Sequence, residues 1–436
     1  MDLLNLNATH DPGAKSWVGS ANDPATDFPV QNLPFGAFSR AGGAEAPRIG
    51  VAIGDQILAV AALADKFSGL AATAARSCEA PTLNALMALG HESWAVLRHA
   101  IFDMLIDPNY AARVGEHLFP INKSLMHLPV SVRNYTDFYA SVFHATNVGR
   151  LFRPENPLLP NYKFVPVGYH GRASSIDLGG EVFRPKGQIR LERDGNPVYA
   201  PSRRLDYETE LGIFIGTPSQ RGKPVLMQEA PQHVFGFCLL NDWSARDIQE
   251  WEYQPLGPFL GKNFATSISP WVVTAEALLP FRSAAFERPA IDPAPLPYLS
   301  DEGDQKSGGY DIKISALIRT MKMAEQGMSA VELGRASFST MYWSVAQMIA
   351  HHTSNGCNLE SGDLLGSGTI SGNLPGSVGC LLELTRGGQQ PITLPNGEIR
   401  AFLADGDEII LQGECISPTH RRIGFGQCSG RILSPV

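Results

Sequence analysis

The amino-acid sequence predicts a mostly β fold of the α+β type: a large antiparallel roll or barrel with added helices, preceded by a smaller N-terminal module. Short runs rich in Val, Ile, Leu and Phe recur between glycine and proline turns, for example at residues 211–215, 236–240 and 409–411, as in antiparallel strands. Strands and helices do not alternate regularly, as they would in a parallel α/β sheet. At 436 residues the chain exceeds the size at which one hydrophobic core usually stops growing, so we expect two domains.

Three local patterns predict the N-terminal module. Residues 1–30 are polar and rich in small side chains, which predicts an irregular lead-in and gives no reason to expect order there. Residues 47–60 alternate in polarity around Gly54-Asp55, a hairpin signal. Apolar positions at broadly helical spacing follow Thr82, whose side chain we expect to cap that helix: Leu83, Leu86, Met87, Leu97 and Ile101.

A domain boundary is expected near residue 125. Pro108, Pro120 and Pro129 interrupt this stretch, and reactive side chains become frequent only after it. We therefore expect an N-terminal domain, residues 1–125, and a catalytic domain, residues 126–436. Within the second domain, residues 282–309 are rich in Pro, Asp, Glu and Gly, which predicts a long surface excursion.

The composition limits the classes of partner. Charged residues make up only 18% of the chain and apolar residues 44%, which predicts extensive buried surface or a subunit interface. A formal net charge of -8 argues against nucleic acid, which attracts basic surfaces, and favours a small-molecule partner. Six scattered cysteines without a C-x-x-C pair predict reduced core thiols. Without a signal-like N-terminus or a run of about 18 apolar residues, we expect a cytoplasmic protein that does not contact membranes.

Four carboxylates suggest a cation site: Asp137, Glu208, Glu210 and Asp242. If the fold brings them together, they form an all-oxygen site of the kind that calcium or magnesium prefers. Glu208 and Glu210 lie in a run, residues 205–215, that is typical of a strand, where side chains two apart share a face. A Glu-x-Glu pair by itself is more often a solvated strand face.

Residues 242–253 predict a helix with one polar face. At about 100° per residue, the side chains that fall on this face are Asp242, Arg246, Gln249 and Tyr253. The alternative is an ordinary solvated face with an Asp242–Arg246 ion pair. Two tryptophans that flank the polar face favour the functional interpretation, and a glycine-rich turn then presents Lys262, which we expect to point inward as a fixed positive charge.

His144 is the candidate general base. It follows Asp137 by seven residues, so a helix over residues 140–148 would place both side chains on one side. Arg153 follows shortly after. A single histidine is more often structural than catalytic, and we interpret His351-His352 in that structural way.

Two glycine-rich segments, residues 168–175 and 366–372, lack the spacing of phosphate-binding loops. They are typical of tight backbone beside a ligand, with Tyr169 and Thr369 as hydrogen-bonding groups. Simple hairpin turns explain the same glycine spacing equally well.

Five segments closely resemble the fumarylacetoacetase family: DFY at 137–139, HATNVG at 144–149, PVGYHGRASS at 166–175, NDWSARDIQ at 241–249 and GSGTISG at 366–372. The resemblance runs from about Asp27 to the C-terminus. It implies a homodimer with a small SH3-like N-terminal barrel and a C-terminal β-roll. The implied activity is metal-dependent hydrolysis of a carbon–carbon bond in 4-fumarylacetoacetate, a diketo acid, to fumarate and acetoacetate, the last step of tyrosine and phenylalanine catabolism.

Carried over position by position, the resemblance also implies residue roles. The main metal ligands would be Asp137, Glu208, Glu210 and Asp242, with Lys262 and Thr266 near a second cation site. The catalytic residues would be His144, which activates water, its partner Glu383, and Arg246, Gln249 and Lys262. The substrate contacts would be Tyr139, Arg153, Tyr169, Gln249, Tyr253 and Thr369. The cofactor would be Ca²⁺, Mg²⁺ or both.

Two other functions remain open at this stage. The first is a related reaction of another oxo acid at the same carboxylate site, such as acylpyruvate hydrolysis or 2-oxo acid decarboxylation. The second is a metal-binding scaffold that has lost its chemistry, since a fold alone does not guarantee activity. A scaffold would lack a base or an oxyanion donor, whereas this chain retains candidates for both.

Overall fold

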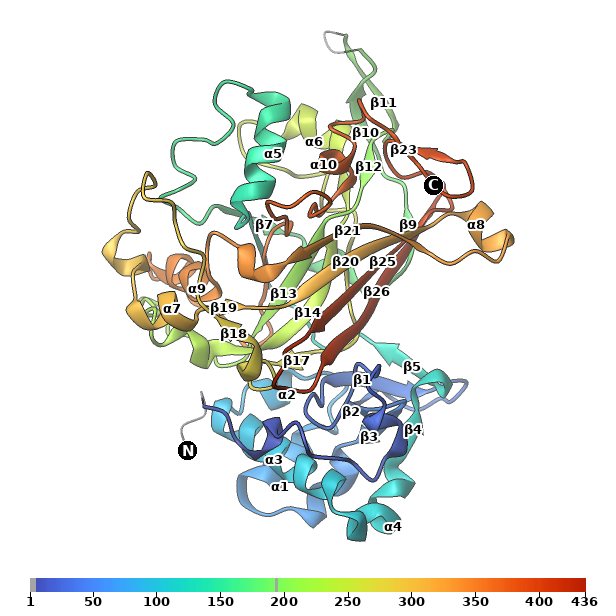
Figure 1. Ribbon diagram of the computed structural model, residues 1–436, viewed down its shortest axis with the longest axis vertical. Helices are drawn as coiled ribbons and strands as arrows, with labels where there is room; N and C mark the ends of the chain where they lie inside the picture. Colours follow the sequence, from blue (N-terminus) through green and yellow to red (C-terminus); the bar gives the residue numbers. More distant parts are fainter. Residues whose placement is uncertain (1–4, 193–194) are drawn as a thin grey trace.

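The computed structural model describes residues 5–192 and 195–436 and consists mainly of β-sheets with helices at their edges (Figure 1). The predicted fold class, mostly β with added helices, is confirmed. A smaller, N-terminal group of elements lies below the two large sheets in this view. No helix within the described ranges is long and apolar enough to cross a membrane.

The N-terminal group contains a five-stranded antiparallel sheet of order β4-β3-β2-β1-β5. Its strands are β1 (Phe35–Arg40), β2 (Arg48–Ile53), β3 (Gln56–Ala59), β4 (Leu118–Pro120) and β5 (Ser124–His127). The predicted hairpin joins β2 to β3, and its turn needs Gly54 because φ is 57° there. A bridge between Phe35 and Val272 connects this sheet to the rest of the chain.

Four helices accompany this sheet: α1 (Gly69–Ser77), α2 (Asn84–Met87), α3 (His91–Ile106) and α4 (Ala111–Val114). The prediction of one helix capped by Thr82 is wrong in two respects. Gly90, with φ of 83°, separates α2 from α3, and the N-cap position of α2 is Leu83, without a side-chain cap. The apolar positions were correctly placed, but a left-handed glycine divides the helix.

The lead-in is irregular as predicted, yet its expected lack of order is wrong for residues 5–30. Thr9 and His10 are buried. His10 Nε2 lies 2.9 Å from the backbone oxygen of Glu276, and Asn7 Nδ2 donates to the Glu276 carboxylate over 2.9 Å. Hydrogen bonds of polar side chains therefore hold this segment against the larger part of the chain, although the segment itself forms no long helix or strand.

The larger part contains two extended sheets. The first has the order β7-β6-β22-β13-β14-β16-β8, with β17 also paired to β14. Its strands are β6 (Tyr135–Phe138), β7 (Gly168–Gly171), β8 (Ile176–Asp177), β13 (Thr209–Ile215), β14 (Val234–Asp242), β16 (Thr266–Ile268), β17 (Val273–Thr274) and β22 (Leu364–Gly366). The second has the order β21-β20-β25-β26-β9, with β9 (Gly179–Phe183), β20 (Lys313–Arg319), β21 (Val331–Ser337), β25 (Glu408–Cys415) and β26 (Ile423–Leu433).

Short strand pairs and helices complete this part. The pairs are β10 (Lys186–Arg190) with β11 (Pro197–Pro201), β12 (Leu205–Asp206) with β15 (Ser244–Ala245), β18 (Arg282–Ser283) with β19 (Gly309–Tyr310), and β23 (Ile392–Thr393) with β24 (Ile399–Arg400). The helices are α5 (Val142–Phe152), α6 (Arg246–Glu252), α7 (Glu302–Ser307), α8 (Met321–Glu325), α9 (Val345–Thr353) and α10 (Leu381–Leu384). Helices α5, α6 and α10 lie together at the same end of the first sheet (Figure 1).

The hydrophobic cores do not separate cleanly at the predicted boundary. One buried cluster combines N-terminal side chains such as Leu97 with Phe214 and Phe235 of the large sheet. The division at residue 125 therefore stays a prediction. Five of the six cysteines are buried free thiols, as expected, but Cys357 is exposed, so the prediction of a core position is wrong for that residue.

The buried lead-in generates a prediction about acid stability. Burial and the Arg98 charge lower the pKa of His10 from 6.5 to about 4. Between these values the unfolded chain binds a proton that the folded chain does not, so stability is lost as pH falls from 6.5 toward 4. The loss should reach about 3 kcal/mol. In His10→Gln, which keeps a donor for the Glu276 carbonyl, this part of the loss should disappear.

Urea unfolding at about pH 7 and about pH 5 measures this difference. His117→Gln is the matched control, because His117 lies on a partly exposed turn beside Glu116. It should keep the wild-type dependence on pH. Equal acid losses in wild type and His10→Gln would refute the role of His10.

Candidate functional site

Three of the four predicted carboxylates meet where neighbouring strands end. Asp137 lies on β6, Glu210 on β13 and Asp242 at the end of β14. Their ligand oxygens all lie within 4.8 Å of one another, and all three residues are buried. Strand β22 runs between β6 and β13 and places Gly366 beside Asp137. A Cβ atom at Gly366 would lie 2.5 Å from Asp137 Oδ1 and 3.1 Å from Glu210 Oε2, so glycine leaves the space between the carboxylates open.

The electrostatics of this carboxylate cluster require a cation or protons. Burial, together with the charges of neighbouring carboxylates, raises the pKa of Asp137 and of Glu210 well above the ordinary range. Asp137 Oδ1 and Glu210 Oε1 are buried without a hydrogen-bond partner among the described residues. Oxygen-only ligands suit a hard divalent cation such as calcium or magnesium. The residues present therefore fit such an ion.

Glu208 lies apart from this cluster. It falls in the break between β12 and β13, where its backbone N–H donates to the side chain of Asn241 over 3.0 Å. Its carboxylate accepts hydrogen bonds from Lys262 and, over 2.6 Å, from Arg246. Burial alone would raise the pKa of Glu208, but the charges of Lys262 and Arg246 lower it below the ordinary value. Glu208 is thus an ionised link between the carboxylate cluster and two cations.

The predicted helix over residues 242–253 begins later than expected. Asp242 pairs with Thr266 across β14 and β16, and α6 starts only at Arg246. The alternative Asp242–Arg246 ion pair does not form either. Asp242 instead accepts from Lys262 over 2.7 Å, and Arg246 donates to Asp206 over 2.9 Å. The inward orientation of Lys262, a buried side chain, agrees with the prediction.

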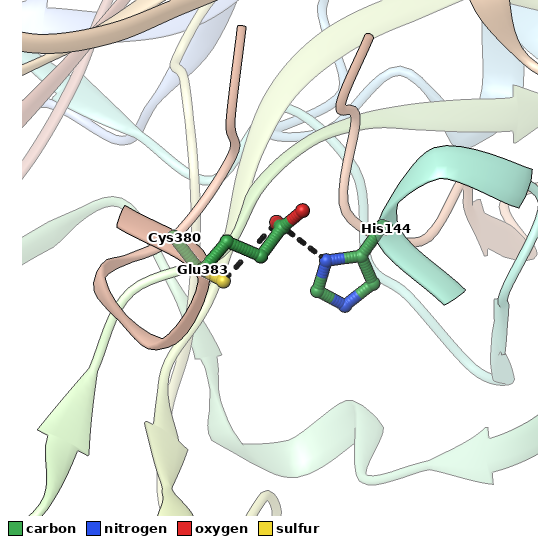
Figure 2. Close-up of side chains that lie close together, drawn as sticks. All are labelled: His144, Cys380 and Glu383. Atoms are coloured by element: carbon green, nitrogen blue, oxygen red, sulfur yellow. Dashed lines mark hydrogen bonds and ion pairs between the residues drawn. The ribbon is translucent and has the colours of Figure 1, made fainter. Parts of the chain in front are cut away.

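His144 pairs with Glu383, as Figure 2 shows. Nδ1 of His144 lies 2.6 Å from Glu383 Oε2, and both side chains are buried. Because the Glu383 carboxylate accepts a hydrogen bond from Nδ1–H, the lone pair of the neutral ring lies on Nε2, which is 4.0 Å from Glu208 Oε1. The expectation that Asp137 and His144 share a helix is wrong: β6 ends at Phe138, and α5 starts at Val142 after the Ser141 cap.

Cys380 lies next to this pair but does not make it a metal site. Its thiol is 3.3 Å from Glu383 Oε2 (Figure 2). Burial, reinforced by the Glu383 charge, raises the pKa of Cys380 well above the ordinary range, so the thiol stays protonated. The 2.6 Å distance between Nδ1 and Oε2 is also shorter than the roughly 3 Å that separates two ligands of one zinc ion. The group is a histidine hydrogen-bonded to a carboxylate, with a thiol beside it.

Two adjoining cavities connect the carboxylate cluster with His144. A cavity of about 400 Å³ reaches Asp137, Glu210 and Lys262, and one of about 230 Å³ reaches His144 and Arg246. The lining residues shared by both cavities include Tyr139, Arg153, Glu208 and Gln249. Among the other predicted contacts, Tyr169 and Thr369 line the larger cavity and Tyr253 the smaller one.

Glu383, Asp242 and Thr266 do not line either cavity. Asp242 and Thr266 border a third, neighbouring cavity of about 190 Å³. Their side chains approach to 3.5 Å, and the Tyr169 hydroxyl donates to Asp242 over 2.9 Å. The structure thus brings all the predicted site residues into one region: all of them line one of the three cavities except Glu383, which lies behind His144.

The glycine-rich segments are tight backbone beside the carboxylates rather than simple hairpin turns. The N–H of Gly368 donates to Glu210 Oε2 over 3.0 Å. Gly368 has φ of 74°, and a Cβ atom there would lie 2.3 Å from the backbone oxygen of Phe138. Glycine is therefore required both by the backbone conformation and by the close approach.

Two buried residues of this region were not predicted. Asp206 binds Arg246, and the Tyr135 hydroxyl is buried without a partner in the described chain, 3.1 Å from a Cβ atom built on Gly366. The available signal was the period of a strand, because Asp206 precedes Glu208 by two residues and Tyr135 precedes Asp137 by two.

Comparisons with known proteins give a consistent family. The family model described as fumarylacetoacetate (FAA) hydrolase C-terminal matches residues 133–432, and that described as fumarylacetoacetase N-terminal matches residues 31–129. The chain is 46% identical to fumarylacetoacetase of Bos taurus over 426 residues, which are 96% of this chain and 98% of that protein. For fumarylacetoacetase of Oryza sativa subsp. japonica the identity is 43% over 421 residues, 94% and 95% of the two chains.

A solved structure supports the fold. It is the fumarylacetoacetate hydrolase from psychrophilic Exiguobacterium antarcticum, which is 19% identical, has a TM-score of 0.50, and covers 92% of this chain and 99% of its own. At this identity the likeness concerns the fold alone.

The open space at Gly366 generates a prediction about cation binding. In Gly366→Ala the added methyl group would occupy the space between Asp137 and Glu210, so the affinity for calcium or magnesium should fall by at least about tenfold. Isothermal titration calorimetry measures the affinity. Gly115→Ala is the control, because a Cβ atom there meets nothing within 4 Å. Unchanged affinity in Gly366→Ala would place the cation elsewhere.

Proposed function

Because this chain belongs to the fumarylacetoacetate hydrolase family, we propose that it hydrolyses a carbon–carbon bond of 4-fumarylacetoacetate to give fumarate and acetoacetate, the last step of tyrosine and phenylalanine catabolism. The observation that carries this proposal is 43–46% identity to fumarylacetoacetases over almost the whole chain. The base beside the carboxylate cluster supports it, because this reaction needs both a nucleophile and a place for negative charge.

His144 would act as the general base. Glu383 accepts a hydrogen bond from its Nδ1–H. This bond fixes the ring and leaves Nε2 free to take a proton from water. The hydroxide adds to the ketone carbon of the fumaryl part, and the bond from that carbon to the adjacent methylene then breaks. The electron pair remains on the methylene as an enolate, which takes up a proton to become acetoacetate. The water oxygen becomes part of the new fumarate carboxylate.

Three side chains that line the two cavities would stabilise the charge that develops. Arg246 and Lys262 are buried cations, and Gln249 Oε1 lies 3.4 Å from Arg246 Nη1. Preorganised donors of this kind are often worth about 3 to 4 kcal/mol each in the transition state. Since both cations are already fixed by carboxylates, little reorganisation is needed during the reaction.

Asp137, Glu210 and Asp242 would hold a calcium or magnesium ion, and Lys262 and Thr266 would lie near a second cation position. Glu208, whose carboxylate accepts from Lys262 and Arg246, would become the fourth ligand by turning toward the ion. A bound divalent cation would supply a Lewis acid that polarises and orients the diketone oxygens. The orphaned oxygens of Asp137 and Glu210 support this assignment.

The remaining lining side chains would bind the ends of the substrate. Arg153 lies where the two cavities meet and offers a positive charge to a substrate carboxylate. Four side chains that carry hydroxyl groups line one or both of the cavities and would orient the oxygens of the diketone: Tyr139, Tyr169, Tyr253 and Thr369.

The protein would work as a cytoplasmic homodimer. The segment after α6 exposes Leu256, Phe259 and Leu260 to 96%, 66% and 45%, an apolar group that a second copy would cover. Free thiols suit a reducing compartment. Light scattering on the purified protein tests the dimer.

Replacing the base is the first test of the mechanism. His144→Ala should lower kcat by about 10³-fold or more, since general bases commonly contribute 10² to 10⁴. Calcium affinity should stay close to wild type because His144 is not a ligand. Loss of the diketone absorbance measures turnover. His351→Ala, at the end of α9, is the control and should remain active.

Wild-type turnover in purified His144→Ala would disprove this assignment of the base. Acylpyruvate offered to the wild-type enzyme in parallel should be a poor substrate. If acylpyruvate is instead preferred, the proposed substrate is wrong. A wild-type protein that binds calcium but turns over neither compound would support the scaffold alternative.

Removing the cation tests its role independently. Chelation followed by dialysis should abolish turnover and lower the unfolding temperature, because the buried carboxylates then repel one another. Adding calcium or magnesium should restore both properties. Activity that survives in a sample shown by elemental analysis to be free of metal would contradict the proposed cofactor.

A further inference from the structure

Asp206 is a buried carboxylate to which neither the family resemblance nor the proposed mechanism gives a role. It ends β12, its side chain is fully inaccessible to solvent, and it does not line the two cavities of the site. Nevertheless it accepts hydrogen bonds from three separate segments of the chain. Its partners are the side chain of Arg246 and the backbone N–H groups of Tyr207, Leu381 and Leu382.

The first connection leads to the cation of the smaller cavity. Arg246 Nε donates to Asp206 Oδ2 over 2.9 Å, and Arg246 Nη1 donates to Glu208 Oε1 over 2.6 Å. The guanidinium is thus held by a carboxylate at each end. A planar group fixed at two points keeps one orientation toward the cavity.

The second connection leads to the base. Leu381 N donates to Asp206 Oδ1 over 2.8 Å, and Leu382 N to Oδ2 over 3.0 Å. These are the first two N–H groups of α10, the short helix that carries Glu383, and the residue before the helix provides no side-chain cap. Asp206 therefore caps α10 from a distant part of the chain and fixes the position from which Glu383 reaches His144.

We infer that Asp206 is a positioning residue that sets the His144–Glu383 pair and the Arg246 guanidinium at a fixed distance from each other. This inference rests on the proposed function, in which His144 and Arg246 act on the same substrate from two sides. A carboxylate is required because it accepts from a cation and from two backbone amides at once. Asparagine has the same size but only one acceptor oxygen and no charge.

Asp206→Asn should therefore impair the chemical step more than substrate binding. Misplacing a catalytic group by about 1 Å can cost about 10²-fold in rate, so kcat should fall by a factor of this order while KM changes little. The matched control is Asp247→Asn, on the same helix as Arg246. Asp247 is also a buried carboxylate, but it binds Ser202 and the Arg203 amide away from the cavities. Its turnover should stay near wild type.

Guanidinium rescue separates positioning from a merely structural effect. In Arg246→Ala, free guanidinium ion has the charge and shape to refill the place beside Asp206 and Glu208 and should restore part of the turnover. Urea, which is similar in shape but neutral, should not. In the double variant Arg246→Ala/Asp206→Asn the rescue should be lost. Equal rescue in both backgrounds, or a kcat of Asp206→Asn equal to that of Asp247→Asn, would overturn the inference.

Two further measurements keep the result interpretable. If Asp206→Asn does not fold, the Arg246→Ala variant alone decides the question. Millimolar guanidinium, but not urea, must then raise the unfolding temperature of Arg246→Ala by more than it changes that of the wild-type protein. If the unfolding temperature does not rise, the Asp206 contact is refuted. This readout needs no substrate. If the wild-type protein fails to hydrolyse fumarylacetoacetate, the proposed function is wrong, whereas the guanidinium measurement still reports on Asp206.

Discussion

The site depends on the burial of many like charges in one small volume. Six carboxylates are buried there, Asp137, Asp206, Glu208, Glu210, Asp242 and Glu383, against two permanent cations, Arg246 and Lys262. In a low-dielectric interior this excess of negative charge is unstable unless protons or a metal ion balance it. Ion pairs balance part of this charge: Glu208 and Asp206 both bind Arg246, while Lys262 bridges Glu208 and Asp242. The carboxylates that face Gly366, Asp137 and Glu210, have no cationic side chain bound to them among the described residues.

The topology of the first sheet determines where this imbalance lies. Strands β6, β22, β13 and β14 are neighbours, and β6 runs parallel to β22, so Asp137 and Gly366 lie side by side. The carboxylate of Glu210 enters from the next strand, and glycine at position 366 places no side chain between the two acidic groups. The rigid sheet, rather than a flexible loop, holds the ligand oxygens. This suits a site that must keep its geometry while its substrate changes.

The sequence predicted which residues of this region lie near one another better than it predicted their local structure. The strand around Glu210 was predicted correctly, because a Glu-x-Glu pair before an apolar run carries information within a few residues. Asp242 was placed on a helix because a spacing of four residues fits a helical face, but pairing with Thr266 keeps it on β14. The contacts of His10 and Asp206 could not be predicted, because their partners, Glu276 and the α10 amides, lie far away in the sequence. The strand period could point to Asp206 as a site residue but not to what it binds. Contacts of that kind depend on topology, which local patterns do not encode.

The same charge distribution also favours His144 as the proposed base over the other titratable groups of the cavities. Glu208 is a poor proton acceptor because Lys262 and Arg246 hold its pKa low, and Asp137 and Glu210 are directed into the carboxylate cluster. Burial would lower the pKa of Lys262, but the charges of Asp242 and Glu208 raise it above the ordinary value. Burial also raises the pKa of Tyr139. Lys262 and Tyr139 therefore both keep their protons. His144 has an ionised carboxylate, Glu383, behind it and another, Glu208, 4.0 Å in front. Both would stabilise the imidazolium that proton abstraction creates, so the electrostatic field that favours a cation at one end of the site would favour a base at the other.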